Sequence, residues 1–428
     1  MNIRVHKRQG RLSLLAMLLV MAVGTGCDSL LEADLPGSLS AAALDDPALA
    51  ETLVLGVRGD FECAFRGYLF REVLWADVGR FHGSTLNWLR SEQRSLSTRE
   101  GGNQNCENSR EPVWLPMHVV RGQAKVAIEL ISGFEAGSVA DPDLLIAEAS
   151  LYKGYATQML SEHYCGIVFD GDGVERTRAD GFTAAAALFT TAIDRGSLSS
   201  AADASRIVNM ARVGRARAKL NLGDLAGTIT DAGAVTKGFI GYNEYESSPT
   251  RLRWDRPFSM DDNITLQPPY RNVTVGGVPD PRVPTEHTSR NGGVTAQYSS
   301  DWWIQLKYRG RDSDIPISTW REAQIMIAEA DPTQSVAIIN LLRSDASGIH
   351  SELDADAWPL PAYAGGTAAE IKAQVIEERR RELFLQGTEV GDDIRTGEHT
   401  KWTQGVALSG LQIDSSATCM PIPVQEFL

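Results

Sequence analysis

The chain has 428 residues, 43% of them hydrophobic, and a formal net charge of −14. This length is enough for a large buried core in one or two domains. The negative charge disfavours contact with nucleic acid, so no nucleic-acid partner is predicted.

The N-terminus is predicted to be an export signal. Four basic residues precede an apolar run at 12–23, which spans roughly 18 Å as a helix against a hydrocarbon core of about 30 Å. The run therefore fits a signal peptide at 1–26 better than a membrane-spanning helix. Gly24-Thr25-Gly26-Cys27 is similar to a bacterial lipobox and predicts a lipidated Cys27, with an ordinary signal peptide as the alternative. Removal of 1–26 leaves 37 basic against 55 acidic residues, a net charge of −18.

Four further cysteines follow Cys27, namely Cys63, Cys106, Cys165 and Cys419. None has the spacing of a zinc-ligand pair. In an oxidising compartment an even number favours two disulfides, with buried free thiols as the alternative. Four cysteines allow three pairings, and their spacing does not choose among them.

The rest of the chain alternates helical patterns with irregular segments. Residues 27–46 lack a period and are predicted to be a tether, followed by a folded domain at 47–428. A helix is predicted from Pro47, capped by Asp46, because apolar residues recur every four positions from Leu49 to Phe61.

Helical pairs are predicted at about 116–236 and 319–387. The pair around Gly223-Asp224, with small residues at Gly214 and Ala226, resembles a tetratricopeptide repeat, in which small residues let two helices approach closely. The last long helix is predicted over 367–386, with Gly387 as its C-terminal cap.

Two segments without helical periodicity, about 62–115 and 239–318, are predicted to form a loop-rich ligand face, because long loops are usually functional or mobile. No catalytic signature is present, so we predict no enzyme, no cofactor and no metal site. Asp170, Asp172 and Glu175 offer oxygen ligands, but their spacing is not that of a helix–loop–helix calcium loop. A solvated acidic turn is the favoured interpretation, and calcium binding stays open.

A run of charges at Glu377–Glu382 continues directly into the apolar turn Leu383–Leu385. The simplest interpretation is a solvated helix face, on which each i,i+4 ion pair contributes about 0.2–0.5 kcal/mol. The adjoining apolar turn favours partial burial of the arginine stems.

This segment, EERRRELFLQGTEVGDDIR, resembles the C-terminal signature of the SusD/RagB family of outer-membrane nutrient-binding lipoproteins. The matching residues are Glu378, Arg379, Arg381, Glu382, Leu383, Gly387, Gly391, Asp393 and Arg395. Other segments are similar to family segments in the family's order: Tyr152–Gly166, Asp280-Pro281-Arg282, Gln305–Ala330 and Met420–Phe427. No segment is diagnostic alone, but the ordered set covers most of the chain.

The resemblance implies a mostly α fold, in which a tetratricopeptide-like helix-pair scaffold carries long irregular loops and a few short strands as the ligand face. It implies a protein anchored by lipid in the outer membrane and exposed at the cell surface.

 It also implies capture, without catalysis, of an oligosaccharide, peptide or other small oligomeric nutrient for a SusC-like TonB-dependent outer-membrane barrel. The alternative is a helical-repeat lipoprotein that scaffolds protein assembly at the outer membrane.

The resemblance also bears on the cysteines. In the family, the turn at the end of 152–166 and the segment 420–427 both pack on the helical core, which implies a Cys165–Cys419 disulfide. Cys63 and Cys106 bracket the irregular aromatic segment and are the second predicted pair. The chain is short for the family, so no sugar preference carries over.

Ligand contacts are predicted in the irregular loops, where ring faces suit the C–H faces of sugars and a few polar groups fix orientation. The aromatic candidates are Trp75, Phe81, Trp88, Tyr242, Tyr270 and Trp302, and the polar candidates are Asp77, His82, Asn87 and Arg290. The alternative is that these rings pack the loops onto the scaffold. Of the adjacent Trp302 and Trp303, one must face the core if they lie in a strand.

Overall fold

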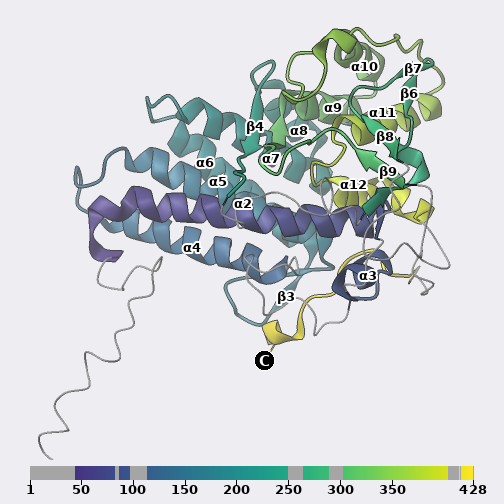
Figure 1. The fold of residues 1–428 in the computed structure, drawn as a ribbon. Helices are drawn as coiled ribbons and strands as arrows, with labels where there is room; N and C mark the ends of the chain where they lie inside the picture. The colour runs from purple at the N-terminus through teal and green to yellow at the C-terminus, as the bar shows by residue number, and fades with distance from the viewer. Residues whose placement is uncertain are drawn as a thin grey trace, which may run out of the picture. The chain divides into compact units, whose positions relative to one another are not determined.

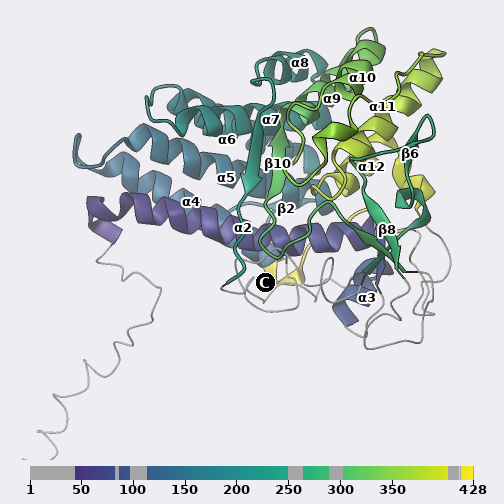
Figure 2. The same ribbon diagram turned by 45° about the horizontal axis from the view of Figure 1, so that its top comes forward.

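Long α-helices make up most of the computed structural model, which describes residues 44–81, 86–96, 113–248, 264–288, 302–402, 414 and 416–427. The first helices are α2 (Ala50–Trp75), α3 (Leu86–Glu92), α4 (Trp114–Gly133), α5 (Pro142–His163), α6 (Arg178–Gly196), α7 (Ala204–Leu222) and α8 (Leu225–Gly233). They are followed by α9 (Trp320–Ala330), α10 (Ser335–Ser344), α11 (Ala368–Glu382) and α12 (Glu389–Thr396). From α4 to α9 each helix packs against the next, which gives the stack seen in Figures 1 and 2. The mostly α fold and its helical pairs are confirmed.

Small residues bring α5, α6 and α7 close together. Phe189 of α6 is fully buried, and a Cβ added at Gly154 of α5 would lie 2.8 Å from its ring. A Cβ added at Gly214 of α7 would lie 2.4 Å from the same ring. Any larger residue at Gly214 would therefore displace Phe189, so the close approach at this glycine is to α6.

Local signals start several helices as predicted. The Asp141 side chain accepts a hydrogen bond from the Leu144 amide at 3.1 Å, and Pro142 occupies the first turn of α5. Thr367 forms a capping box with Glu370 at the start of α11. Such caps satisfy amide donors that the helix itself leaves without partners.

The N-terminal helix differs from the prediction at both ends. Pro47–Leu49 form a 3₁₀ turn, η2, and the residue before α2 is Leu49, not Asp46. The helix then continues to Trp75, so the prediction of a loop from residue 62 is wrong for 62–75. Every residue from Phe61 to Trp75 is buried, and a helix buried all round has no polar face from which a period can be recognised.

The short strands form five antiparallel pairs among the described residues. These are β1 (Gly79–Phe81) with β5 (Ile264–Leu266), β2 (Ile167–Val168) with β3 (Glu175–Arg176), β4 (Ile240–Asn243) with β10 (Ile315–Thr319), β6 (Thr274–Val275) with β7 (Val278–Pro279), and β8 (Thr285–Thr288) with β9 (Trp302–Gln305). The β1–β5 pair joins the end of α2 to a segment almost two hundred positions later, with Gly79 opposite Leu266.

Half of the charged run of α11 is buried and the rest is partly buried, so a solvated helix face is the wrong interpretation. Glu378, Arg379 and Glu382 are 0%, 3% and 6% exposed. Arg282, itself 1% exposed, donates to Glu378 at 2.6 Å and to Glu382 at 2.7 Å. Arg321 of α9 donates to both oxygens of Glu382 at 2.7 Å. This buried ion network joins the strand-rich segment to the C-terminal helices.

The C-terminal helix also ends earlier than predicted. α11 stops at Glu382, and a turn with positive φ at Leu385 (56°) and Gly387 (82°) leads into α12. Lys307, which is buried, donates from Nζ to the Phe384 carbonyl in this turn at 2.7 Å. The turn redirects the chain, so that α12 packs against α2 and α5 and does not extend α11.

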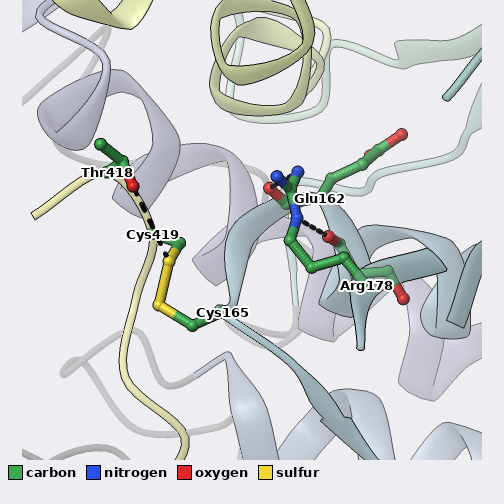
Figure 3. The surroundings of a disulfide bond; sticks show 6 residues. Glu162, Cys165, Arg178, Thr418 and Cys419 are labelled. Atoms are coloured by element: carbon green, nitrogen blue, oxygen red, sulfur yellow. Dashed lines mark hydrogen bonds between the residues drawn. A yellow bond between two sulfur atoms is a disulfide. The ribbon is translucent and has the colours of Figure 1, made fainter. Parts of the chain in front are cut away.

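A disulfide fixes the C-terminal segment. Cys165 and Cys419 are bonded with a Cα–Cα distance of 5.1 Å, which confirms the predicted pair (Figure 3). Beside it, the Cys165 amide donates to the Met420 carbonyl at 2.9 Å, and the Met420 amide donates to the His163 carbonyl at 2.8 Å. Cys63 is also disulfide-bonded, while Cys106 lies outside the described residues.

No helix in the described ranges is long and apolar enough to cross a membrane. The predicted signal peptide and Cys27 lie outside those ranges.

Candidate functional site

A cavity of about 590 Å³ lies where the end of α2, β1, η4 (Pro268–Tyr270), α11 and α12 meet. Its volume is within the range of small-molecule binding sites. Charged and aromatic side chains dominate its lining: Asp77, Arg80, Tyr270, Glu377, Arg379, Arg380, Glu389, Asp392, Asp393, Glu398, Lys401 and Trp402.

One wall is a chain of four side chains that runs from Asp77 to Asp393. The Asp77 carboxylate pairs with Arg94 at 2.9 Å. The Arg94 guanidinium lies 4.8 Å from the centre of the Trp402 ring, in a cation–π contact. The Trp402 indole N–H then donates to the Asp393 carboxylate at 2.6 Å.

A second wall has the same order of groups: a carboxylate, a guanidinium, an aromatic ring and a second carboxylate. The Arg380 guanidinium donates to Glu377 at 2.8 and 2.9 Å and lies 4.8 Å from the centre of the Tyr270 ring. The Tyr270 hydroxyl donates to the Glu389 carboxylate. Tyr270 also stacks on Phe384, in the turn after α11, with 5.5 Å between ring centres. This packing fixes the ring with its hydroxyl toward Glu389.

Both walls therefore end on carboxylates of α12. Glu389 and Asp393 are four residues apart, which places them on one face of the helix. Burial raises the pKa of Glu389 to about 7; Asp392 and Glu377 add to the rise, while Tyr270 and Arg380 oppose it. Burial, and then the charge of Glu389, raise the pKa of Asp393 well above its usual range.

Two further acids of the lining form ion pairs. Asp392 accepts from Arg379 at 2.6 Å, and Glu398 pairs with Lys401 at the rim. The site can therefore offer ligands fixed carboxylate acceptors and the edges of two rings.

Replacing Glu389 by Gln is expected to stabilise the protein at alkaline pH and to leave its stability unchanged in acid. The folded state binds the Glu389 proton more tightly than the unfolded state, because the pKa is about 7 against an ordinary 4.5. Below the ordinary pKa of 4.5 the Glu389 carboxyl does not destabilise the protein. As the pH rises from there to the folded pKa of about 7, the destabilisation by the ionised carboxylate grows. Because the side chain borders a cavity, we expect a gain of about 1–2 kcal/mol at about pH 8.

Urea unfolding at about pH 4.5 and about pH 8 measures this difference. Asp356→Asn, in the exposed turn η5 (Ala355–Ala357), removes the same charge far from the cavity lining and should give no pH-dependent gain. A loss of stability of equal size at both pH values would contradict the prediction.

The structure brings two of the predicted ligand residues, Asp77 and Tyr270, into the cavity. Three others are core residues: Trp75, Phe81 and Trp302 are 0%, 2% and 1% exposed. A ring with no open face cannot stack on a ligand, so the alternative of packing onto the scaffold holds for these three.

The other candidates lie elsewhere. Trp88 of α3 is partly buried and packs against Phe70 and Phe81, at 4.4 and 4.9 Å between ring centres. The ring of Tyr242 in β4 packs against His350, with 5.9 Å between ring centres, and does not line the cavity. His82, Arg290 and the side chain of Asn87 lie outside the described residues. Trp303, next to the buried Trp302, is only partly buried, as strand alternation predicts.

The prediction missed Glu389, Asp393 and Trp402. The signal available for the first two was the segment TEVGDDIR, which was matched to a family signature but not to a site. Three acids within five positions, directly after a turn and on a short helix, indicate a local concentration of negative charge.

The acidic turn near Asp170 is occupied by internal ion pairs. Asp170 pairs with Lys125 at 3.0 Å, and Asp172 pairs with Arg176. Across the described ranges, no three His, Cys, Asp or Glu side chains are grouped closely enough to hold a metal ion.

No protein-family model matches this sequence, and no curated protein is significantly similar to it. Solved structures do match. A SusD-like protein from Bacteroides fragilis is 12% identical, with a TM-score of 0.65, over 92% of this chain and 98% of its own. A SusD homolog from Bacteroides thetaiotaomicron is 15% identical, with a TM-score of 0.64, over 91% of this chain and 97% of its own.

A third structure, described as a SusD-like carbohydrate binding protein from Bacteroides vulgatus, is 13% identical, with a TM-score of 0.61. It is matched over 82% of this chain and 83% of its own. These identities are too low to transfer a ligand, but the agreement extends over nearly the whole domain. The resemblance predicted from the sequence is therefore confirmed at the level of the fold: this chain has the SusD-like fold.

Proposed function

We propose that this protein captures an oligosaccharide in the cavity between η4, α11 and α12 and does not cleave it. The observation that carries the proposal is the cavity itself, whose size and polar and aromatic lining suit a short glycan. A solved protein with the same fold is described as carbohydrate binding.

The arrangement of acids favours binding over hydrolysis. Glycosidases place two carboxyl groups on opposite sides of the scissile bond. Glu389 and Asp393 instead lie one turn apart on the same helix, and each accepts a hydrogen bond from an aromatic side chain. They are therefore positioned to hold polar groups of a ligand along one wall.

Filling the cavity is expected to abolish capture without disturbing the fold. Ala373 of α11 lines the cavity and is exposed, so Ala373→Phe adds volume inside it and removes no contact of the core. We expect at least a tenfold loss of glycan affinity, equivalent to about 1.4 kcal/mol, by calorimetric titration with a panel of oligosaccharides. The bound glycans should be recovered unchanged.

The matched control is Ala369→Phe, at an exposed position one turn earlier on the same helix and outside the cavity lining. It should bind like the parent protein. Equal affinity of all three proteins would place glycan binding elsewhere, and release of shorter sugars would contradict the absence of catalysis.

The proposal extends to the setting of capture. We infer lipid attachment at Cys27, display at the cell surface on the outer membrane, and delivery to a SusC-like TonB-dependent barrel. The support is the signal-peptide pattern ending in Gly-Thr-Gly-Cys together with the SusD-like fold. Mass spectrometry of the mature N-terminus should find an acylated Cys27, and purification from native membranes should retain a barrel. An unmodified protein that begins elsewhere would contradict the anchor.

A further inference from the structure

Two carboxylates in the cavity wall lack a basic partner. Within the part of the chain that the structure describes, Glu389 and Asp393 make no ion pair; they accept hydrogen bonds from the neutral Tyr270 and Trp402. The other acids of the lining differ, since Asp77, Glu377, Asp392 and Glu398 each pair with Arg or Lys. The unbalanced negative charge of the cavity is therefore concentrated at one place.

Two ionised carboxylates at this place destabilise the protein when no ligand is bound. Like charges four residues apart on a helix repel each other, and burial strengthens the repulsion. The raised pKa values of both groups agree with this geometry. The titratable groups around the pair are Glu72 of α2, Arg94, Tyr270, Glu377, Arg380, Asp392 and Glu398. A positive group entering the cavity would remove the repulsion and release the cost.

The hydrogen-bonding capacity of the pair specifies the kind of cation. Each carboxylate accepts one hydrogen bond from an aromatic side chain, and a carboxylate can accept about four. An ammonium group has three N–H donors and no acceptor, so it fits between two partly used carboxylates. A metal ion fits less well, because no third ligating carboxyl or imidazole group joins the pair among the described residues.

We propose that Glu389 and Asp393 bind a protonated amino group of the ligand, so that the nutrient is an oligosaccharide of amino sugars with free amines. The inference rests on the proposed capture function and names its ligand class. The paired arginines and the two rings would then contact the neutral parts of the sugar.

The test compares two probes with the same sugar backbone: a glucosamine trimer with free amines and its fully N-acetylated counterpart, whose amides are neutral. Titration at about pH 7 keeps most of the amines protonated while part of the Glu389 carboxyl is ionised. We expect the free-amine trimer to bind at least tenfold more tightly. In the double variant Glu389→Gln with Asp393→Asn this preference should vanish, because the affinity for the free-amine trimer falls to that for the acetylated trimer. Asp356→Asn, a charge-matched control on η5, should keep the preference.

Three outcomes would overturn the inference. Equal affinity for the two trimers would leave capture intact, if Ala373→Phe still abolishes binding, but would remove the amine site. A preference that persists in the double variant would place the amine elsewhere. Tighter binding of trilysine than of the glucosamine trimer would assign the amine to peptides, not to sugars. Because the glycan panel is run independently, a failure of capture itself is recognised separately.

Discussion

Replacing Arg282 by Met is expected to lower the free energy of unfolding by about 3–5 kcal/mol, because it removes one cation from a cluster of buried carboxylates. The guanidinium donates to Asp280 at 2.7 and 2.8 Å, in addition to its bonds to Glu378 and Glu382. All three acids are buried. Breaking such a network costs far more than the network contributes over an apolar core of the same shape.

Chemical denaturation of the parent and the variant measures this loss. The control is Arg195→Met, which removes a surface pair with Asp143 at 2.7 Å, where the side chains are 47% and 32% exposed. Exposed pairs contribute about 0–1 kcal/mol, so the control should be nearly neutral. Similar effects of the two substitutions would show that burial of the network is not what makes Arg282 important.

Acid provides a second measurement of the same network. Arg321 and Arg282 hold the pKa of Glu382 down at about 2, against the opposing effect of burial, and Arg282 also lowers the pKa of Asp280. A carboxyl whose folded pKa is lowered contributes stability above its ordinary pKa, and this contribution is lost as the pH falls toward the folded value. The difference between parent and Arg282→Met should therefore shrink as the pH falls from about 4.5 to about 2.

The network also explains what the family signature does in this chain. Glu378, Arg379 and Glu382 were matched as letters of a motif, while Arg282 was matched separately in a short turn. In the folded chain Glu378 and Glu382 meet Arg282, and Arg379 pairs with Asp392 at the cavity wall. The signature thus positions α11 and α12, and with them the carboxylates of the cavity.

The helices were predictable where one face is polar and local caps mark the ends. The start of α5 is an example, because Asp141 and Pro142 act within one turn of the chain. The end of α2 was not predictable, since its last fifteen residues are buried on every side and carry no amphipathic period. Burial of Glu378 and Glu382 was equally hidden, because their partner Arg282 lies about one hundred positions away.

The cavity depends on long-range contacts even more strongly. Its walls come from the end of α2, from η4 and from the C-terminal helices, and no local pattern links these segments. Aromatic residues were a poor guide to the site, because the sequence does not distinguish a ring that stacks on a ligand from a ring in the core. Trp75, Phe81 and Trp302 are core residues. Asp77 and Tyr270 were found because they belong to the predicted irregular segments, whereas Trp402 lies beyond them.

Replacing Cys165 and Cys419 together by Ser is expected to cost about 2–5 kcal/mol of stability. The bond closes a loop of 254 positions, and a loop of this length loses much conformational freedom in the unfolded state. The folded segment keeps other contacts, including the hydrogen bonds of Met420 and the donation from the Trp114 indole to Glu426 at 2.7 Å. The segment should therefore stay in place in the variant but detach more readily than the rest of the domain.

Thermal unfolding and limited proteolysis together measure this effect. The double variant should unfold at a lower temperature, with the first cleavage near 416–427, because this segment is anchored by few contacts. Thr418→Ala, beside the bond with its hydroxyl 4.0 Å from the Cys419 sulfur, is the control and should change little (Figure 3). Reductant should destabilise the parent by more than the double variant, since only the bond of Cys63 remains to be reduced there. If the variant melts and is cleaved like the parent, the Cys165–Cys419 bond does not hold the C-terminal segment to the helical core.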